Sequence, residues 1–516
     1  MTSSFSLPDR LLGYGRTQPE TVAVVMGRNR ISYAGLAEMA LAARSQIGLP
    51  VLPGAGRIAV RTEKSAQTIA LIAACMMARR SFLLPSTALG ARSLGAMLGR
   101  VGCQGLLAAV PADAGAGIRV HPVDFRPDAD PGVPQTAQPD AQPAMATAAD
   151  DQPTMVAKAN VSFMLTTSGS TGLPKIVPLT AGAVDQFTDW AAAQFRISSG
   201  TRVLSYAPLS FDLCLLDIWA TLKVGGTVVL VDQERATDGR YLAELVRAER
   251  IQVVQSVPMF YRLLADAHAG QPFTSIEQLI VTGDKVPAQL LGQLPSLFPN
   301  ARIHNVYGST ETNDSFLHEV VGVADVAADL PIGRPIAGVD ALVVDSDGAV
   351  LDGPAEGELL VRTPFQTAGY LDPAANAGKF VAIGDGTQPY FRTGDLVRRD
   401  AHGVYTLLGR NDFQVKVRGT RVNLAEVEHV ILGHSAVLEA AVIGVPDETT
   451  GTRIHAVVRR SAPGSPDSLT LRERCRLRLP RAAIPTTISL VDAPLPMTAT
   501  GKVDRQTLIR TVLDRI

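Results

Sequence analysis

The stretch TTSGSTGLPK, from Thr166 to Lys175, places many small hydrogen-bond donors before a single cation. Glycines let backbone N–H groups approach an anion closely, hydroxyls add rotatable donors, and lysine adds a point charge. Such a set suits a polyphosphate. It is not a Walker A loop, because Leu173 and Pro174 separate Gly172 from the lysine. A flexible Ser/Gly linker is the alternative, but the apolar run VSFML before the stretch and the ordered Gly-Leu-Pro-Lys end favour a phosphate-binding loop.

Five further motifs follow in order along the chain. They are NVYGSTET (305–312), GELLVRTPFQTAGYLD (357–372), YFRTGDL (390–396), GRNDFQVKVRGTRVNLAEVE (409–428) and LPMTATGKVDR (495–505). Together with LTTSGSTGLPK they resemble the signatures of the adenylate-forming superfamily, which contains acyl-CoA synthetases, firefly-type luciferases and the adenylation domains of non-ribosomal peptide synthetases. The resemblance covers essentially the whole chain. One departure is Ile176, where the family usually has glycine, and we expect it to alter loop packing without abolishing phosphate binding.

The resemblance implies that a carboxylate attacks the α-phosphate of ATP, giving an acyl-adenylate and pyrophosphate. Positioning and electrostatics would supply most of the catalysis. The implied β- and γ-phosphate loop comprises Thr167, Ser168, Gly169, Ser170, Thr171, Gly172 and Lys175. The other implied nucleotide-binding residues are Gly283, Asn305, Tyr307, Gly308, Ser309, Asp395 and Arg410. Tyr307 would pack on the adenine, and Asp395 would accept from both ribose hydroxyls.

The same resemblance implies three catalytic residues. Thr310 would donate to the α-phosphate, and Glu311 would help to hold Mg²⁺, which neutralises phosphate oxygens. Lys502 would bridge the substrate carboxylate and the α-phosphate, where negative charge converges. A surface lysine near a chain end is ordinarily just solvated, so this role rests on the ordered set of motifs.

Asp212 bears on which acid is activated. Amino-acid-activating members of the superfamily carry an aspartate in the phrase Phe-Asp, where it pairs with the substrate ammonium, and here it follows Phe211. The alternative is a helix N-cap, because Asp212 precedes an apolar periodic run. The remaining implied pocket residues are Leu213, Leu216, Ser256, Ile280, Thr282, Val306, Asp314 and Ser315. A buried Asp314 carboxylate needs donors or a cation. The partner of Asp314 would be a substrate hydroxyl, a second substrate ammonium, or its own neighbours Asn313 and Ser315. The pocket therefore favours a small or medium polar amino acid.

The end of the chain, shortly after GKVDR, leads us to expect that the acyl group leaves in trans. The first interpretation is a free-standing aminoacyl–carrier-protein ligase, with the phosphopantetheine thiol of a separate carrier as the acceptor. The alternatives are a CoA ligase acting on a small carboxylic acid, and a catalytically silent binding module. The intact Lys502, Glu311 and Asp395 argue against the silent module.

The elements that must position these residues indicate an α/β fold. From about Thr201, short β-branched runs alternate with helical patterns, as in RVLSYA before DLCLLDIWATLKVG and IQVVQSV before PMFYRLLADAHA. Such alternation predicts a parallel sheet with helices on its faces. The segment from Ala108 to Lys158 is rich in Ala, Pro, Asp and Gln, and we expect it to be a mobile surface connection.

Beyond about Arg410 the pattern changes to a small α+β module. VYTLLGR and FQVKVRG are predicted to form a hairpin, LAEVEHVILGH a helix, and LEAAVIGV and IHAVVRR strands. We therefore expect residues 1–411 to form an adenylation core of parallel-rich sheets and residues 412–516 a mobile lid. The resemblance makes Asp412 the hinge, about which the lid would rotate between adenylation and thiol transfer.

Composition excludes several other classes of protein. The 516 residues are 46% apolar and 19% charged, as in ordinary globular proteins. A formal net charge of −1 gives no electrostatic footprint for nucleic acid or an anionic membrane. No apolar run reaches the roughly 18 residues of a membrane span, and no signal peptide is visible at the N-terminus. Four scattered cysteines (Cys75, Cys103, Cys214 and Cys475) predict reduced core thiols and a cytoplasmic location.

Overall fold

The computed structural model describes residues 6–47, 56–87, 89–109, 118, 120–125, 161–167, 174–321, 330–384, 388–410, 414–417, 420–447, 451–462, 466–479, 481–498 and 502–513. Residues 168–173 of the expected phosphate loop and the expected hinge residue Asp412 lie outside these ranges, as does most of the segment predicted to be a mobile connection.

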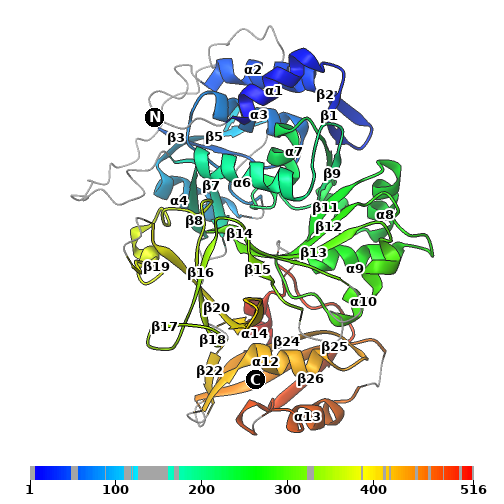
Figure 1. Ribbon diagram of the computed structural model, residues 1–516, viewed down its shortest axis with the longest axis vertical. Helices are drawn as coiled ribbons and strands as arrows, with labels where there is room; N and C mark the ends of the chain where they lie inside the picture. Colours follow the sequence, from blue (N-terminus) through cyan, green and yellow to red (C-terminus); the bar gives the residue numbers. More distant parts are fainter. Residues whose placement is uncertain are drawn as a thin grey trace.

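The sheet that carries most of the expected pocket has the strand order β15-β14-β13-β12-β11-β9-β10-β1-β2 (Figure 1). Its strands are β1 (Val22–Met26), β2 (Asn29–Ser32), β9 (Arg202–Ser205), β10 (Thr227–Leu230), β11 (Val253–Ser256), β12 (Gln278–Thr282), β13 (Arg302–Ser309), β14 (Asn313–Glu319) and β15 (Arg334–Pro335). Strands β9 to β13 pair in parallel, as predicted. Every residue of β10, β11 and β12 is buried, because helices cover both faces of a parallel sheet.

Two layers of helices enclose this sheet. On one face, α8 (Gly239–Ala248), α9 (Pro258–Ala267) and α10 (Ala288–Leu297) share a hydrophobic core with β9 to β13. On the other face lie α6 (Ala181–Gln194), the π-helix η1 (Leu215–Ala220) and α7 (Thr221–Lys223). The predicted helix over DLCLLDIWATLKVG is therefore present, but Leu215–Ala220 form a π-helix, a geometry that is frequent at functional sites.

A second sheet has the order β6-β5-β3-β4-β7-β8 and holds the expected phosphate loop. Its strands are β3 (Arg57–Val60), β4 (Phe82–Leu83), β5 (Cys103–Ala108), β6 (Val120–Pro122), β7 (Val161–Thr167) and β8 (Lys175–Thr180). Thr167 and Lys175 are register partners in the antiparallel β7–β8 pair, so the loop between them closes a hairpin. The helices of this layer are α1 (Leu7–Thr17), α2 (Tyr33–Ile47), α3 (Ala66–Met77) and α4 (Ala91–Val101).

A third, antiparallel sheet has the order β17-β16-β18-β20-β19, with β21 paired to β20. The strands are β16 (Asp340–Val344), β17 (Val350–Leu351), β18 (Ala355–Arg362), β19 (Phe380–Val381), β20 (Tyr390–Arg399) and β21 (Tyr405–Arg410). It is joined to the first sheet where Tyr405 packs edge-on against Phe316, with ring centroids 5.0 Å apart. The short 3₁₀ turn η3 (Pro373–Asn376) lies between β18 and β19, and a similar turn, η2 (Gln233–Arg235), follows β10 of the first sheet.

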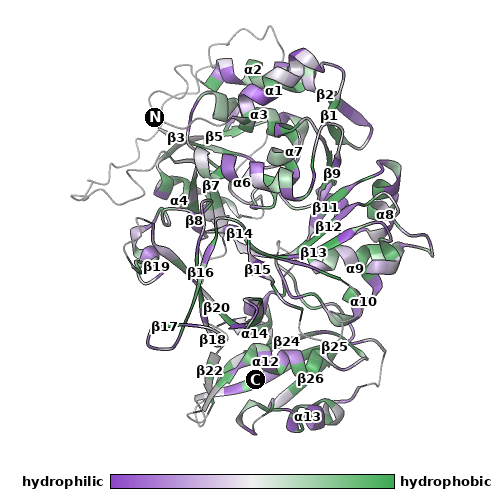
Figure 2. Ribbon diagram, viewed as in Figure 1, coloured by the Kyte–Doolittle hydropathy of each residue, from purple (hydrophilic) through white to green (hydrophobic). Residues whose placement is uncertain are grey.

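The C-terminal part is a separate α+β unit at the bottom of Figure 1. It contains β22 (Gln414–Val417), β23 (Thr420–Asn423), α12 (Leu424–Leu432), β24 (Val437–Asp447), β25 (Gly451–Arg460), α13 (Ser468–Arg476), η5 (Arg481–Ala483), β26 (Thr487–Val491) and α14 (Arg505–Leu513). The predicted helix after residue 423 and the two predicted strands are confirmed. Figure 2 shows hydrophobic residues along β24–β26 and a largely hydrophilic α13.

The predicted hairpin between VYTLLGR and FQVKVRG is wrong. VYTLLGR forms β21, which pairs with β20, whereas β22 pairs with β23. Two residues separate β22 from β23, which is the shortest common hairpin connection, and Tyr405 of β21 buries its ring against the third sheet. Within the part of the chain that the structure describes, no helix is long and apolar enough to cross a membrane.

Candidate active site

The tight turn between β13 and β14 presents two of the expected catalytic side chains. Thr312 donates its backbone N–H to the Ser309 carbonyl over 3.0 Å, which closes the turn around Thr310 and Glu311. A Cβ on Gly308 would lie 2.3 Å from the carbonyl oxygen of Asn313. Glycine is therefore required for the strands to approach this closely, which explains why this position of the motif tolerates no side chain.

Asp212 lies against this turn. Thr310 Oγ1 donates a hydrogen bond to Asp212 Oδ2 over 2.7 Å. The π-helix begins after Cys214 without a side-chain cap, so the alternative N-cap role of Asp212 is not observed. Burial raises the pKa of Asp212, the Thr310 hydrogen bond opposes this, and the negative charge of Glu311 raises the pKa further.

Lys502 reaches the same place from the C-terminal unit. Its positive charge lowers the pKa of Asp212, so the two side chains interact although nearly 300 residues separate them in sequence. Two hydrogen bonds connect the backbone of Lys502 to Thr498. The Thr498 N–H donates to the Lys502 carbonyl over 2.7 Å, and the Lys502 N–H donates to Thr498 Oγ1 over 3.2 Å. The structure thus places Asp212 in hydrogen-bond contact with Thr310 and near enough to Lys502 for their charges to interact.

A second cluster joins the first sheet to the third. Tyr307 donates its hydroxyl hydrogen to Asp395 Oδ2, and Arg410 Nη1 donates to Asp395 Oδ1 over 3.0 Å. The β20–β21 register places Asp395 opposite Arg410. Burial and the nearby Asp395 charge raise the pKa of Tyr307 well above its usual value. Both Asp395 oxygens already accept protein hydrogen bonds, so ribose hydroxyls would share or displace them.

Glu311 is linked to the end of the expected phosphate loop through Tyr370. The Tyr370 hydroxyl donates to Glu311 Oε1 over 2.6 Å, and Lys175 Nζ lies 4.6 Å from the centroid of the Tyr370 ring. Sequence reasoning did not single out Tyr370, although it lies within the quoted motif at residues 357–372. Among the described residues no group of three or more His, Cys, Asp or Glu could hold a metal by itself. One carboxylate is nonetheless compatible with Mg²⁺, because this ion is commonly held by one or two carboxylates and substrate phosphates.

The expected substrate pocket gathers at the carboxyl ends of the parallel strands, the usual ligand site of open α/β sheets. Ser256, Thr282 and Val306 lie at or near the ends of β11, β12 and β13, with Ile280 buried in β12. Leu213 and Leu216 come from the start of the π-helix segment.

Three expected residues have side chains or backbones committed to the fold. Ser315 Oγ lies 3.0 Å from the Asn313 carbonyl oxygen. Asn305 Nδ2 donates to the Pro331 carbonyl over 2.7 Å, which anchors the chain after β14. Gly283 adopts φ +83°, a left-handed conformation that favours glycine.

Asp314, by contrast, has a buried carboxylate oxygen without a hydrogen-bond partner among the described residues. Its side chain is 8% exposed, and Oδ2 has no hydrogen-bond partner. Burial, together with the negative charge of Asp212, raises its pKa to about 8.

Two buried charged residues beside the pocket were missed by sequence reasoning. Lys64 Nζ donates to the carbonyls of Ser205 and Tyr206 over 2.8 and 2.9 Å, and burial lowers its pKa to about 7. Asp217, in the π-helix, is completely buried, and neither carboxylate oxygen has a hydrogen-bond partner. Burial raises the pKa of Asp217 well above its usual value; the charge of Lys64 opposes this rise and that of Asp314 adds to it. A charged residue within the apolar run after Asp212 was the signal for Asp217, whereas Lys64 belongs to no motif.

The raised pKa of Asp314 predicts a pH-dependent stability difference. An acid whose pKa is about 8 when folded and about 3.9 when unfolded contributes stability below pH 4 that is lost as the pH rises toward 8. Asp314→Asn cannot ionise, so its melting temperature relative to wild type should be higher at pH 8 than at pH 5. The slope approaches about 1.4 kcal/mol per pH unit, for a total of the order of a few kcal/mol.

Thermal denaturation at both pH values checks this prediction. The matched control is Asp266→Asn, which makes the same change on the exposed face of α9. Parallel pH profiles for wild type and Asp314→Asn would show that the carboxylate ionises freely in the folded protein.

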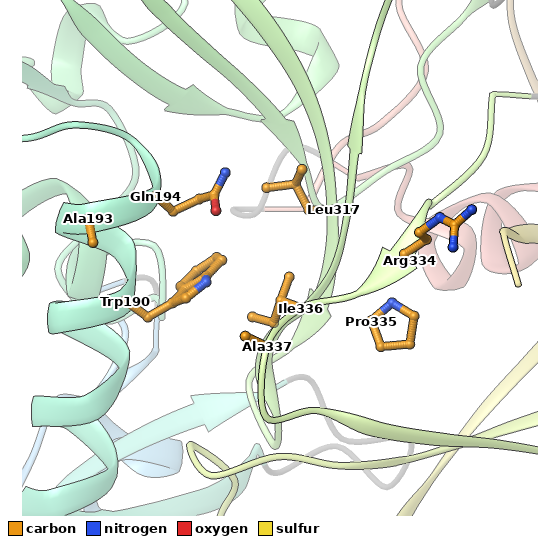
Figure 3. A pocket seen from close by; sticks show the side chains of 8 residues that line it. All are labelled: Trp190, Ala193, Gln194, Leu317, Arg334, Pro335, Ile336 and Ala337. Carbon is orange, nitrogen blue, oxygen red and sulfur yellow. The ribbon is translucent and has the colours of Figure 1, made fainter.

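A cavity of about 430 Å³ lies apart from this site (Figure 3). It opens between α6 and the β14–β15 segment and is lined by Trp190, Ala193, Gln194, Leu317, Arg334, Pro335, Ile336 and Ala337. None of these residues belongs to the expected pocket, and the lining carries one charged side chain, Arg334, whose head points away from the indole of Trp190. This cavity therefore does not offer the acidic and hydroxyl groups that surround Asp212.

Comparison with known proteins places this geometry in a family. Residues 14–371 match the AMP-binding enzyme family, and residues 426–502 match the AMP-binding enzyme C-terminal domain. The chain is 35% identical over 358 residues to an L-proline–[L-prolyl-carrier protein] ligase of Pseudomonas fluorescens, covering 68% of this chain and 69% of the relative. It is 27% identical over 510 residues to a D-alanine–D-alanyl carrier protein ligase of Bacillus licheniformis, covering 96% and 97%.

The fold also matches that of a solved structure. The crystal structure of ATP-bound MatB from Rhodopseudomonas palustris superimposes with a TM-score of 0.80 at 24% identity, over 99% of this chain and 100% of that one. The two family matches occur in the expected order, and the first alone covers more than half of the chain. This protein belongs to the AMP-binding enzyme family.

Proposed function

We propose that the protein activates an amino acid with ATP, forming an aminoacyl-adenylate and pyrophosphate, and then transfers the aminoacyl group to the phosphopantetheine thiol of a separate carrier protein. The observation that carries this proposal is the contact between Asp212 and Thr310 with Lys502 beside them. The site thus offers the Asp212 carboxylate to a substrate ammonium group. The Thr310 hydroxyl and the Lys502 cation are available to a substrate carboxylate and a phosphate. The relatives that are named as amino acid–carrier protein ligases support the same activity.

In this mechanism Asp212 holds the substrate ammonium and thereby directs the substrate carboxylate toward the α-phosphate. Lys502 and Thr310 stabilise the negative charge where the carboxylate oxygen attacks phosphorus and pyrophosphate leaves. Tyr307, with Asp395 and Arg410 beyond it, positions the nucleoside. A bound Mg²⁺ would be held by Glu311 and phosphate oxygens and would neutralise phosphate charge.

Transfer requires a second arrangement of the same chain. A carrier thiol must reach the adenylate carbonyl, and in the present arrangement Lys502 is near enough to Asp212 for its charge to lower the pKa of that carboxyl. We propose that the C-terminal unit, residues 412–516, rotates about Asp412 after adenylation. Domain closure about a few boundary residues is an established way to alternate two arrangements.

Amino-acid-dependent ATP–pyrophosphate exchange tests the proposed function. Each amino acid in a broad panel is paired with the α-hydroxy acid of the same side chain, which lacks the ammonium group. We expect exchange with at least one amino acid and a loss of roughly 100-fold or more for its hydroxy analogue, because Asp212 would lose the cation that balances its charge. Equal exchange with both members of a pair would contradict amino-acid recognition.

The acceptor is tested separately. Loading of a phosphopantetheinylated carrier protein is compared with formation of the thioester of free CoA. Preferential loading of the carrier supports the proposed function, whereas equal or greater use of CoA would make the protein an acyl-CoA ligase.

A further inference from the structure

Two buried carboxylates beside the pocket leave three oxygens without hydrogen bonds. Asp314 Oδ2 and both oxygens of Asp217 have no hydrogen-bond partner within the part of the chain that the structure describes. Asp217 is completely buried, and Asp314 is 8% exposed. Burying an acceptor without a donor costs free energy of the order of 1–3 kcal/mol, and more when the group is charged. Such an arrangement is unfavourable in the empty protein, and a bound ligand that supplies hydrogen-bond donors would relieve it.

The charges around these carboxylates do not balance. Asp314 and Asp212 are close enough for the negative charge of Asp212 to raise the pKa of Asp314, and Asp314 in turn raises the pKa of Asp217. Lys64 is the cation that opposes the raised pKa of Asp217, and Lys502 has the same effect on Asp212. These interactions give Asp314 two acidic neighbours.

The substrate proposed above supplies one cation, its α-ammonium group, and this is taken by Asp212. Lys502 is then committed to the substrate carboxylate and the α-phosphate, and Lys64 to the backbone carbonyls of Ser205 and Tyr206 and to the charge of Asp217. After this assignment no cation is left for Asp314, and its ionised form in this buried position is favoured only beside a positive partner.

We propose that the amino acid carries a second ammonium group on its side chain, and that this group binds Asp314 with Asp217 behind it. The inference rests on the proposed function, since it names the substrate class of the same site. An ammonium has three N–H donors and no acceptor, which matches acceptor-only carboxylates. The Ser256 hydroxyl at the end of β11, which is buried without a hydrogen-bond partner, offers one more acceptor in the pocket.

A side-chain hydroxyl fits these observations less well. A hydroxyl supplies one donor and no charge, so it would leave Asp314 without a cation beside its two acidic neighbours. A neutral apolar side chain would supply neither. Burial, with the charge of Asp212, raises the pKa of Asp314 to about 8, and a cation bound beside it would favour the ionised carboxylate.

The test uses wild-type protein and substrates that differ in one group. Pyrophosphate exchange is measured with 2,4-diaminobutyrate, ornithine and lysine, and with the isosteres in which a methyl or hydroxyl replaces the distal ammonium: norvaline and homoserine for diaminobutyrate, and norleucine for ornithine. We expect kcat/KM for the best diamino acid to exceed that of its methyl isostere at least about 100-fold, because a site built for a polar group rejects analogues that lack it. The chain length of the best diamino acid reports the distance between the two ammonium sites.

Matched variants locate the effect. Asp314→Asn should lower exchange with the best diamino acid by about 100-fold or more while retaining exchange with its neutral isostere, and Asp217→Asn should cause a smaller loss. Asp266→Asn, the same change at an exposed position on α9, should leave all rates unchanged. Circular dichroism confirms that each variant is folded, and the wild-type panel decides the question even if a variant is not.

The outcomes separate this inference from the proposed function. If norvaline or homoserine is exchanged as fast as diaminobutyrate or faster, the second ammonium site is wrong and amino-acid activation stands. If Asp314→Asn is folded and keeps the wild-type preference, Asp314 does not bind the side chain. If exchange occurs with carboxylic acids that lack any amine, the proposed function and the inference fail together.

Discussion

Lys502→Ala is expected to lower amino-acid-dependent pyrophosphate exchange by about two to three orders of magnitude while leaving thiol transfer from a preformed aminoacyl-adenylate largely intact. The Lys502 ammonium is the cation from the C-terminal unit that interacts with Asp212 in the present arrangement. Removing one preorganised group that stabilises developing charge typically costs about 10²–10³ in rate. The transfer step needs the C-terminal unit in another position, so the missing ammonium should matter little there.

Two assays on the same preparation check this expectation. Exchange reports the first half-reaction, and carrier loading from synthetic adenylate reports the second. The reciprocal variant is Asp412→Pro, because proline fixes φ near −65° and removes the backbone donor at the expected hinge. It should retain exchange and lose transfer. If each variant loses both activities in parallel, one rigid arrangement performs the whole reaction and the proposed rotation is wrong.

The contacts between the first sheet region and the C-terminal unit are weak polar contacts that can break when the unit rotates. Lys285 Nζ lies 3.1 Å from His429 Nδ1, and Arg262 Nη1 lies 3.4 Å from Glu439 Oε1, each pair linking the first sheet region to the C-terminal unit. Both pairs are at least partly exposed to water, where such contacts are worth about 0–1 kcal/mol. Interfaces between domains that move are typically polar in this way.

The strand and helix order of the first sheet could be predicted from sequence because its signal is local. Apolar runs such as those of β11 and β12 are buried on both faces, and each is followed by an amphipathic helix with a period of 3.6 residues. The hairpin error near residue 410 has the opposite cause. β21 and β22 are both short and follow each other closely in the sequence, and only the third sheet, built from distant segments, determines that β21 pairs with β20.

The residues of the candidate site likewise fall into two groups: those that local sequence motifs identify, and those that only the three-dimensional structure reveals. Motifs identified Asp212, Thr310 and Lys502, and the structure brings them together. Two features needed coordinates instead: Lys64 contacts the pocket from a segment with no motif, and Asp395 has both oxygens occupied by Tyr307 and Arg410. Residue types and spacing in a sequence do not show which acceptors are already satisfied, and that information is what distinguishes Asp314 and Asp217 from ordinary buried carboxylates.

The second large effect is expected at Asp212. Asp212→Ala should lower kcat/KM for the amino acid by about two to four orders of magnitude, since removing one partner of a buried ion pair costs roughly 3–5 kcal/mol. The KM for ATP should change far less, because the groups expected to hold the nucleoside, Tyr307 and Asp395, form a separate cluster. Pyrophosphate exchange at varied concentrations of each substrate measures the two constants separately.

Two controls separate loss of the carboxylate from loss of the turn. Asp212 accepts a hydrogen bond from Thr310 over 2.7 Å, so its removal also frees a hydroxyl that is expected at the α-phosphate. Asp212→Asn keeps an acceptor for Thr310 but carries no charge, and it should lose nearly as much activity as Asp212→Ala if ion pairing with the substrate is the cause. Recovery of most activity in Asp212→Asn would instead assign Asp212 to positioning Thr310. Exchange at the wild-type rate in both variants would remove Asp212 from substrate recognition altogether, because the half-buried carboxylate would then serve neither the ammonium group nor the catalytic turn.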